Sequence, residues 1–348
     1  MIIAKDDLPT FLDGLLGTYQ VFVPLADGGE SRYVPLAPGG TFTWQGVNTR
    51  KPPKEILFPQ SEVLYSYEVG GDRVELREHF DKTKRVVFGI RPCDARSFLH
   101  LDRVFLEQEH QDPYYRERRE NAVMVGMACL EPASTCFCTS LGGGPFAADG
   151  LDLLFIDLGD RYLVRRVTPR GEALLREQPA LFRPAGEADR LAAREAEEKA
   201  KSLMSPIPDL SGVKPWLDAG FGDPLWDRVY EKCIGCAVCT YLCPTCHCFD
   251  LTDEAEENQC VSGVRIRTWD TCAFPLFTLH ASGHNPRPTG KERFRQRVMH
   301  KFRYFVENWG EAACVGCGRC IINCPVNLDI REVLREIMAR AAGAGVSA

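Results

Sequence analysis

Two stretches of the sequence repeat one unusual spacing of four cysteines, Cys-x2-Cys-x2-Cys-x3-Cys-Pro. In each copy a glycine, Gly235 or Gly316, precedes the second cysteine, where it lets the backbone approach a bound group closely. The proline after the fourth cysteine turns the chain in a new direction. The first run contains Cys233, Cys236, Cys239 and Cys243, and the second contains Cys314, Cys317, Cys320 and Cys324. Eight thiols held in two short loops predict a pair of metal centres.

This spacing is typical of proteins that bind two [4Fe–4S] clusters, in which the fourth cysteine of each run ligates the other cluster. Zinc is disfavoured, because zinc sites usually take four ligands from two cysteine pairs rather than two complete runs. Crossed ligation holds the clusters near each other, so electrons can pass between them. We therefore expect one cluster at Cys233, Cys236, Cys239 and Cys324, and the other at Cys314, Cys317, Cys320 and Cys243.

The chain divides into two regions by its residue patterns. Residues 1–205 look α/β, with buried strands predicted at 85–90 and 122–127, a helix at 95–105 and a hairpin at 153–167. Further predictions are extended structure at 56–67, a polar helix at 188–203 and helices at 294–309 and 328–341.

The segment around 205–215 is rich in proline, glycine and serine, which favours a linker. The expected division is an α/β domain at 1–205, a linker at 206–225 and an α-helical ferredoxin domain at 226–348. The gap between the two cysteine runs is too long for a compact bacterial ferredoxin. The predicted fold class is therefore α+β, and the C-terminal domain carries inserted segments.

Four further cysteines lie in the N-terminal region, just after the predicted strands. Because the carboxyl ends of parallel strands share one edge, these thiols could converge on a third [4Fe–4S] site. Alternatively they are reduced, partly buried thiols that behave as small apolar residues. Arg91 and Asp94 could tune such a site or tie the strand to the next helix. The four are Cys93, Cys129, Cys136 and Cys138.

Other cysteines and basic residues have blander interpretations. A role beside the first cluster is favoured over a further metal site for the remaining cysteines, two of which flank His247. Most of the basic stretch from Arg287 to Arg303 is expected to be a solvated helix face, although a docking face for a partner subunit is possible. The remaining cysteines are Cys246, Cys248, Cys260 and Cys272.

Composition sets the class of protein. The chain has 16 cysteines in 348 residues, with no secretory signal and no apolar run long enough to span a membrane. Metal or redox chemistry in the cytoplasm of an anaerobic or microaerobic cell is therefore expected, rather than disulfides. A net charge of −6 gives no reason to expect nucleic-acid binding. The sequence contains no flavin, nicotinamide or Walker A fingerprint.

Several motifs together resemble one iron–sulfur family. They are residues 90–97, 112–115, 135–140 and 281–288, with the two cysteine runs, and the resemblance covers about residues 50–335. The family holds the β subunits of cytoplasmic group 3 [NiFe] hydrogenases (sulfhydrogenases) and an iron–sulfur component of anaerobic sulfite reductase. The resemblance implies an electron relay in a soluble complex. The relay would connect an FAD/NAD(P)H-binding subunit with a catalytic oxidoreductase subunit, which would be a hydrogenase, a sulfite reductase or a heterodisulfide reductase-like protein.

Two rival functions stay open at this point. The chain could be an enzyme with a substrate site at the N-terminal cluster, which requires three cysteine ligands and one free iron. It could instead be an interaction scaffold in which the Cys93 group is inert.

Overall fold

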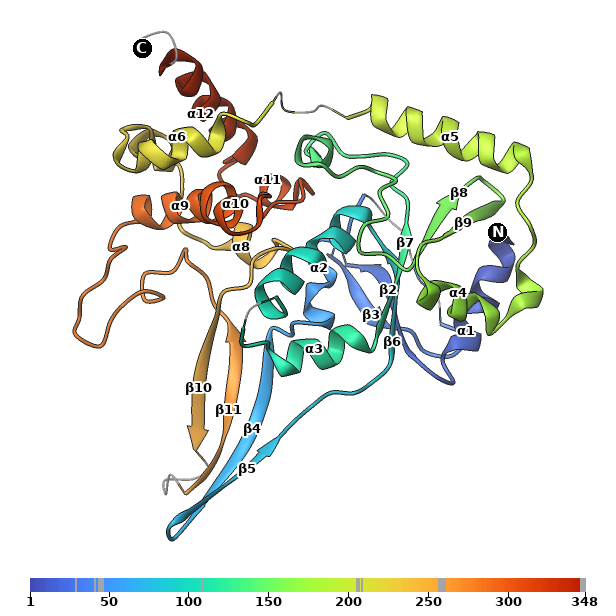
Figure 1. Ribbon diagram of the computed structural model, residues 1–348, viewed down its shortest axis with the longest axis horizontal. Coiled ribbons are helices and arrows are strands. Elements are labelled where there is room, and N and C mark those ends of the chain that lie inside the picture. The colour runs from blue at the N-terminus through green and yellow to red at the C-terminus, as the bar shows by residue number, and fades with distance from the viewer. Residues whose placement is uncertain are drawn as a thin grey trace.

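The computed structural model describes residues 1–28, 30–40, 42, 47–107, 109–204, 207, 209–255 and 261–344. It confirms the predicted α+β class, with an N-terminal sheet domain and a mainly helical C-terminal region that carries both cysteine runs (Figure 1). Within the described residues, no helix is both long enough and apolar enough to cross a lipid bilayer.

A seven-stranded sheet forms the N-terminal domain, in the order β1-β9-β8-β7-β6-β2-β3. The four central strands β2, β6, β7 and β8 are parallel, and the pairs at both edges are antiparallel. Every residue of β6 and β7 is buried, which explains why each is a continuous apolar run. The strands are β1 (Ile2–Ala4), β2 (Gln20–Asp27), β3 (Glu30–Pro35), β6 (Arg85–Ile90), β7 (Ala122–Met127), β8 (Leu153–Asp157) and β9 (Arg161–Arg166).

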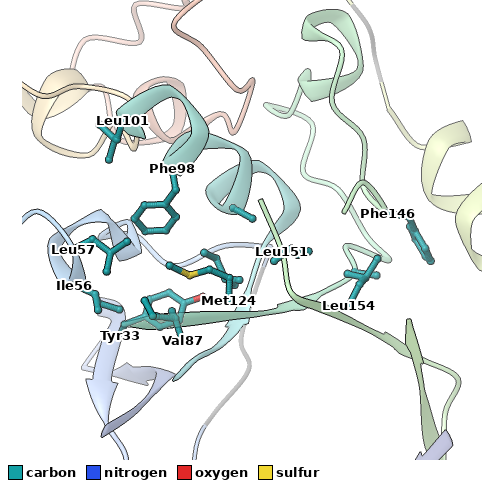
Figure 2. Packing of buried hydrophobic residues seen from close by; sticks show 14 of the residues in the cluster. Tyr33, Ile56, Leu57, Val87, Phe98, Leu101, Met124, Phe146, Leu151 and Leu154 are labelled. Atoms are coloured by element: carbon teal, nitrogen blue, oxygen red, sulfur yellow. The ribbon is translucent and has the colours of Figure 1, made fainter. Parts of the chain in front are cut away.

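Helices cover both faces of this sheet. Phe98 and Leu101 of α2 pack with Tyr115 of α3 on one face, beside Met124 of the sheet (Figure 2). Phe11 of α1 lies in a separate core on the other face. The predicted strands, the hairpin and the helix at 188–203 are confirmed. The helices are α1 (Leu8–Leu15), α2 (Pro92–Phe105), α3 (Pro113–Glu120), α4 (Pro169–Arg176) and α5 (Glu187–Ser202).

A second, antiparallel sheet joins the two halves of the sequence. Its order is β10-β11-β4-β5, and it extends away from the body as a long arm (Figure 1). Near its base Arg267 pairs with Glu62 and Asp112, all from different segments. The predicted extended segment 56–67 overlaps β4, which begins at Ser61. The strands are β4 (Ser61–Gly70), β5 (Arg73–Glu78), β10 (Phe249–Ala255) and β11 (Ser262–Trp269).

This sheet pairs strands from either side of the predicted boundary at residue 205, so the division into 1–205, 206–225 and 226–348 stays a prediction. The expected linker also contains α6, which packs on α12 near the C-terminus. Residues 205, 206 and 208 lie outside the described residues.

The C-terminal helices share a core built around Trp226, Val298 and Leu334. The helix predicted at 294–309 is confirmed as α9, one π-helical turn at His300–Tyr304, and α10. The helix predicted at 328–341 is α12. The elements are α6 (Val213–Ala219), α7 (Leu225–Tyr230), α8 (Val238–Tyr241), α9 (Gly290–Met299), α10 (Phe305–Trp309), α11 (Arg319–Ile322) and α12 (Ile330–Ala344).

The packing of α2 predicts a large difference between two identical substitutions. Leu101→Ala should destabilise the protein by about 2–5 kcal/mol, because the fully buried side chain leaves a cavity. Leu76→Ala, on exposed strand β5 with 63% of the side chain accessible, should change stability by less than about 0.5 kcal/mol. Thermal unfolding of the anaerobically purified variants measures both. Equal melting temperatures would contradict the assignment of Leu101 to the core.

Candidate iron–sulfur centres

The first cysteine run and the last cysteine of the second run surround one pocket. Cys233, Cys236 and Cys239 line it together with Cys324. The loop turns through two left-handed residues, Gly235 (φ 69°) and Ala237 (φ 64°), before α8 begins. This arrangement brings together the four thiols expected to bind the first cluster, and it is the arrangement that crossed ligation requires.

The second run lies beside Cys243, its expected fourth ligand. The Cys314, Cys317 and Cys320 thiols are close enough to Cys243 for its charge to influence their pKa. Burial raises the pKa of Cys314 to about 12 and that of Cys317 to about 11. Thiolates at these positions therefore need a bound metal or positive charge to be stable.

The four N-terminal cysteines also converge on one pocket. Cys129 follows β7, and Cys136 and Cys138 come from the next loop, as expected. Cys93 differs from the expectation, because it lies in the first turn of α2 rather than in a loop. Parallel strands β6 and β7 end at this edge of the sheet, which is why residues distant in sequence meet here.

This N-terminal site is packed directly against the second cysteine run, since Gly316 and Cys317 line the same pocket. The Phe137 amide donates a hydrogen bond to the Gly316 carbonyl at 2.9 Å. A Cβ atom on Gly316 would lie 2.5 Å from the Cys138 backbone nitrogen, so only glycine fits. By contrast, Gly235 in the first run has no atom within 4 Å of that position. The second run thus lies between the first run and the N-terminal site.

Buried polar atoms test whether clusters fit these pockets. Across the described part of the chain, three buried side-chain nitrogen or oxygen atoms lack a hydrogen-bond partner: Thr139 Oγ1, Arg293 Nε and Arg297 Nε. Both arginines line the pocket of the first run, and Thr139 directly follows Cys138. Buried donors almost always have acceptors, and the sulfurs of an iron–sulfur cluster would supply them. The donor set and the unpaired groups therefore both fit [4Fe–4S] clusters.

Buried positive charge surrounds the cysteine runs. Lys301 is 3% exposed, and its Nζ lies 3.2 Å from Cys243 Sγ and 2.9 Å from the Ala313 carbonyl. Burial by itself lowers the pKa of Lys301, but the neighbouring thiols, Cys243 foremost, outweigh it and raise the pKa overall. Arg297 is buried in the same way, and its nearest anionic groups are Cys239 and Cys320. These side chains offset the negative charge that reduced clusters carry.

A buried ion pair connects the N-terminal site to the second run. Arg319, between Cys317 and Cys320, donates to both carboxylate oxygens of Asp94 at 2.5 and 2.7 Å. Each side chain is 1% exposed. Asp94 follows Cys93, so its role is to tie α2 to the C-terminal region. Arg91 instead donates to the Ala128 carbonyl at 2.7 Å, just before Cys129.

The sequence interpretation missed these buried cations. The basic stretch 287–303 was expected to be mostly solvated, yet Arg297 and Lys301 are buried. The signal that could have found them is the spacing of Arg293, Arg297 and Lys301, which places all three on one helix face toward the cysteines.

Three of the remaining cysteines also lie close to this region. Cys246 contacts the Cys243 thiol, and Cys248 contacts Cys272. Cys260 lies outside the described residues.

Comparison with known proteins agrees with the geometry. Residues 232–328, which hold both runs, match the 4Fe-4S dicluster domain family. Over 329 residues the chain is 33% identical to sulfhydrogenase 2 subunit beta of Pyrococcus furiosus, covering 94% of this chain and 95% of the relative. The chain belongs to the sulfhydrogenase β-subunit family. It is an iron–sulfur electron-transfer protein with a two-cluster domain. No solved structure matches the chain significantly.

The contact between Lys301 and Cys243 predicts a shift in a reduction potential. Lys301→Met should lower the potential of the cluster next to Cys243 by on the order of 100 mV, since a nearby buried positive charge favours the reduced state by a few kcal/mol at an effective dielectric constant of about 20. EPR-monitored redox titration measures this shift. The control is Lys82→Met, which removes an exposed lysine. Identical potentials in both variants would contradict the electrostatic role.

Proposed function

We propose that this chain relays single electrons within a hydrogenase complex, where it connects an FAD/NAD(P)H-binding subunit with the catalytic subunit. The observation that carries the proposal is the row of three cysteine sites, in which each site touches the next. The similar protein of Pyrococcus furiosus is named as part of a sulfhydrogenase, which supports a hydrogenase over a sulfite reductase or a heterodisulfide reductase-like partner.

The proposal includes a third [4Fe–4S] cluster, ligated by Cys93, Cys129, Cys136 and Cys138. Its support is the convergence of these thiols on one pocket and the unpaired Thr139 hydroxyl beside it. Burial raises the pKa of Cys129 to about 11, so the thiolate form requires a strong positive partner. Bound iron is such a partner, and it makes these thiols ligands rather than inert apolar side chains.

A path for electrons follows from the order of the sites. The N-terminal site adjoins Cys317 of the second run, and Cys320 lies between the second run and the first. The first run reaches the surface, because Cys236 is exposed and the neighbouring Ile234 is 65% exposed. A partner that docks at this end would lie near the first cluster, while the N-terminal site forms the other end of the row.

The alternative of a substrate-binding enzyme receives less support. An open iron at the N-terminal site needs one missing cysteine ligand, whereas four thiols line that pocket. A four-cysteine cluster is the arrangement of an electron carrier, and each of its electrons enters and leaves without a bond to substrate.

Iron analysis tests the third cluster. The anaerobically purified protein should contain about twelve irons and as many acid-labile sulfides per chain, for three clusters of four irons. Cys136→Ser should reduce this to about eight while the dicluster EPR signal persists. Cys260→Ser, which removes a cysteine outside the three proposed sites, should keep about twelve. About eight irons in all three proteins would mean that the N-terminal thiols are not ligands.

A further inference from the structure

Cys248 and Cys272 form a thiol pair outside the three proposed cluster sites. Cys248 directly precedes β10 and Cys272 lies three residues after β11, and these strands pair with Phe249 opposite Trp269. The ladder continues past the strands, since the Asp270 amide donates to the Cys248 carbonyl at 3.0 Å. The two sulfurs lie in hydrogen-bonding contact, with Cys272 buried and Cys248 half-buried. The hairpin therefore holds two thiols together that are 24 positions apart in the sequence.

The pair is fixed against both cysteine runs. On one side, Thr271 is fully buried and its hydroxyl lies 2.6 Å from that of Thr240, which follows Cys239 of the first run. On the other side, Lys301 Nζ donates to Thr245 Oγ1 at 3.0 Å while it also contacts Cys243. The segment that carries Cys248 therefore touches the surroundings of one proposed cluster, and the segment that carries Cys272 touches the other.

A buried lysine lies beside the pair. Lys54 is 2% exposed, its Nζ donates to the Cys246 carbonyl at 2.9 Å, and it lies 4.0 Å from the centre of the Trp269 ring. Among the described residues, no carboxylate forms an ion pair with Lys54. A buried ammonium without a carboxylate partner favours an anionic sulfur nearby.

The two thiols differ in acidity. The hydrogen bond from Cys272, followed by the charges of Lys301 and Lys54, outweighs burial and lowers the pKa of Cys248 to about 7. The same hydrogen bond and burial raise the pKa of Cys272. A thiolate in contact with a protonated thiol is the arrangement that thiol–disulfide chemistry uses.

Direct sulfur–sulfur contact distinguishes this pair from cluster ligands. Iron atoms and sulfides separate the cysteine sulfurs that bind one cuboidal cluster, so those sulfurs do not touch. Within the ranges that the structure describes, no group of three or more Cys, His, Asp or Glu side chains is close enough to hold a single metal ion. Two contacting thiols without a third ligand match a dithiol rather than a metal site.

We propose that Cys248 and Cys272 are a redox-active dithiol that exchanges two electrons with the adjacent clusters. In the reductive direction the Cys248–Cys272 S–S bond breaks, each of two reduced clusters gives one electron, and two protons from solvent complete the two thiols. In reverse, the dithiol loses two protons and one electron passes to each of two oxidised clusters. This inference rests on the proposed relay, and it adds a two-electron store between one-electron carriers.

A redox titration with mass detection tests the pair without relying on cluster content. The native protein is equilibrated anaerobically in glutathione or dithiothreitol buffers, alkylated, digested and analysed by mass spectrometry. Oxidising buffers should produce about one Cys248–Cys272 disulfide per chain, and reducing buffers should return both thiols to the alkylated form. If both cysteines are alkylated at every buffer potential, the proposal is wrong.

Electron counting then tests the link to the clusters. Oxidised protein titrated with titanium(III) citrate should take up about two more electrons per chain than Cys248→Ser, because only the native protein holds the disulfide. Cys260→Ser should match the native protein. Equal uptake by the native protein and Cys248→Ser would overturn the proposal. A loss of four irons in Cys248→Ser or Cys272→Ser would also overturn it, because the residue would then be a cluster ligand.

The two proposals fail in different ways. A missing third cluster changes the iron content but leaves the disulfide titration intact, whereas an inert thiol pair leaves the iron content and the cluster EPR signals unchanged.

Discussion

The buried ion pair between Asp94 and Arg319 sets the geometry on which the cysteine sites depend. Asp94 follows a cysteine of the N-terminal site, and Arg319 lies between two cysteines of the second run. The two hydrogen bonds fix both distance and orientation, and Arg319 is held further by the Thr49 carbonyl at 2.7 Å. A buried charge that loses its partner costs about 3–5 kcal/mol, so separating the two halves would disrupt both sites. The sheet of β4, β5, β10 and β11 makes a second connection between them.

Positive charge is the other organising feature of the C-terminal region. Arg297 and Lys301 lie one helical turn apart on α9 and the π-helical turn that follows, and both face sulfur rather than carboxylate. The wider turn belongs to a class of helix irregularity that is frequent at functional sites. Buried cations are costly unless an anion accompanies them, and iron–sulfur clusters with four thiolates carry net negative charge. The fold therefore places cations where bound clusters make them favourable.

Local patterns in the sequence predicted much of this structure, and contacts between distant segments explain what was missed. Strands β6 and β7 are short apolar runs, and the hairpin of β8 and β9 has its turn glycine, so each could be recognised from neighbouring residues. The pairing of β4 with β11 joins residues about 200 positions apart, which no local pattern records. Burial of Arg297 was missed because arginine is usually exposed. The contact of Cys248 with Cys272 likewise depends on the register of β10 and β11.

The central claim is that three iron–sulfur sites follow one another through this chain, and anomalous diffraction at the iron edge tests it most directly. Crystals grown without oxygen should show three separate iron peaks, in the order of the N-terminal site, the site of Cys314, and the site of Cys233. The middle peak should lie next to both Cys243 and Lys301. Two peaks with none beside Cys93 would contradict the row of three sites, and a peak between Cys248 and Cys272 would contradict the dithiol.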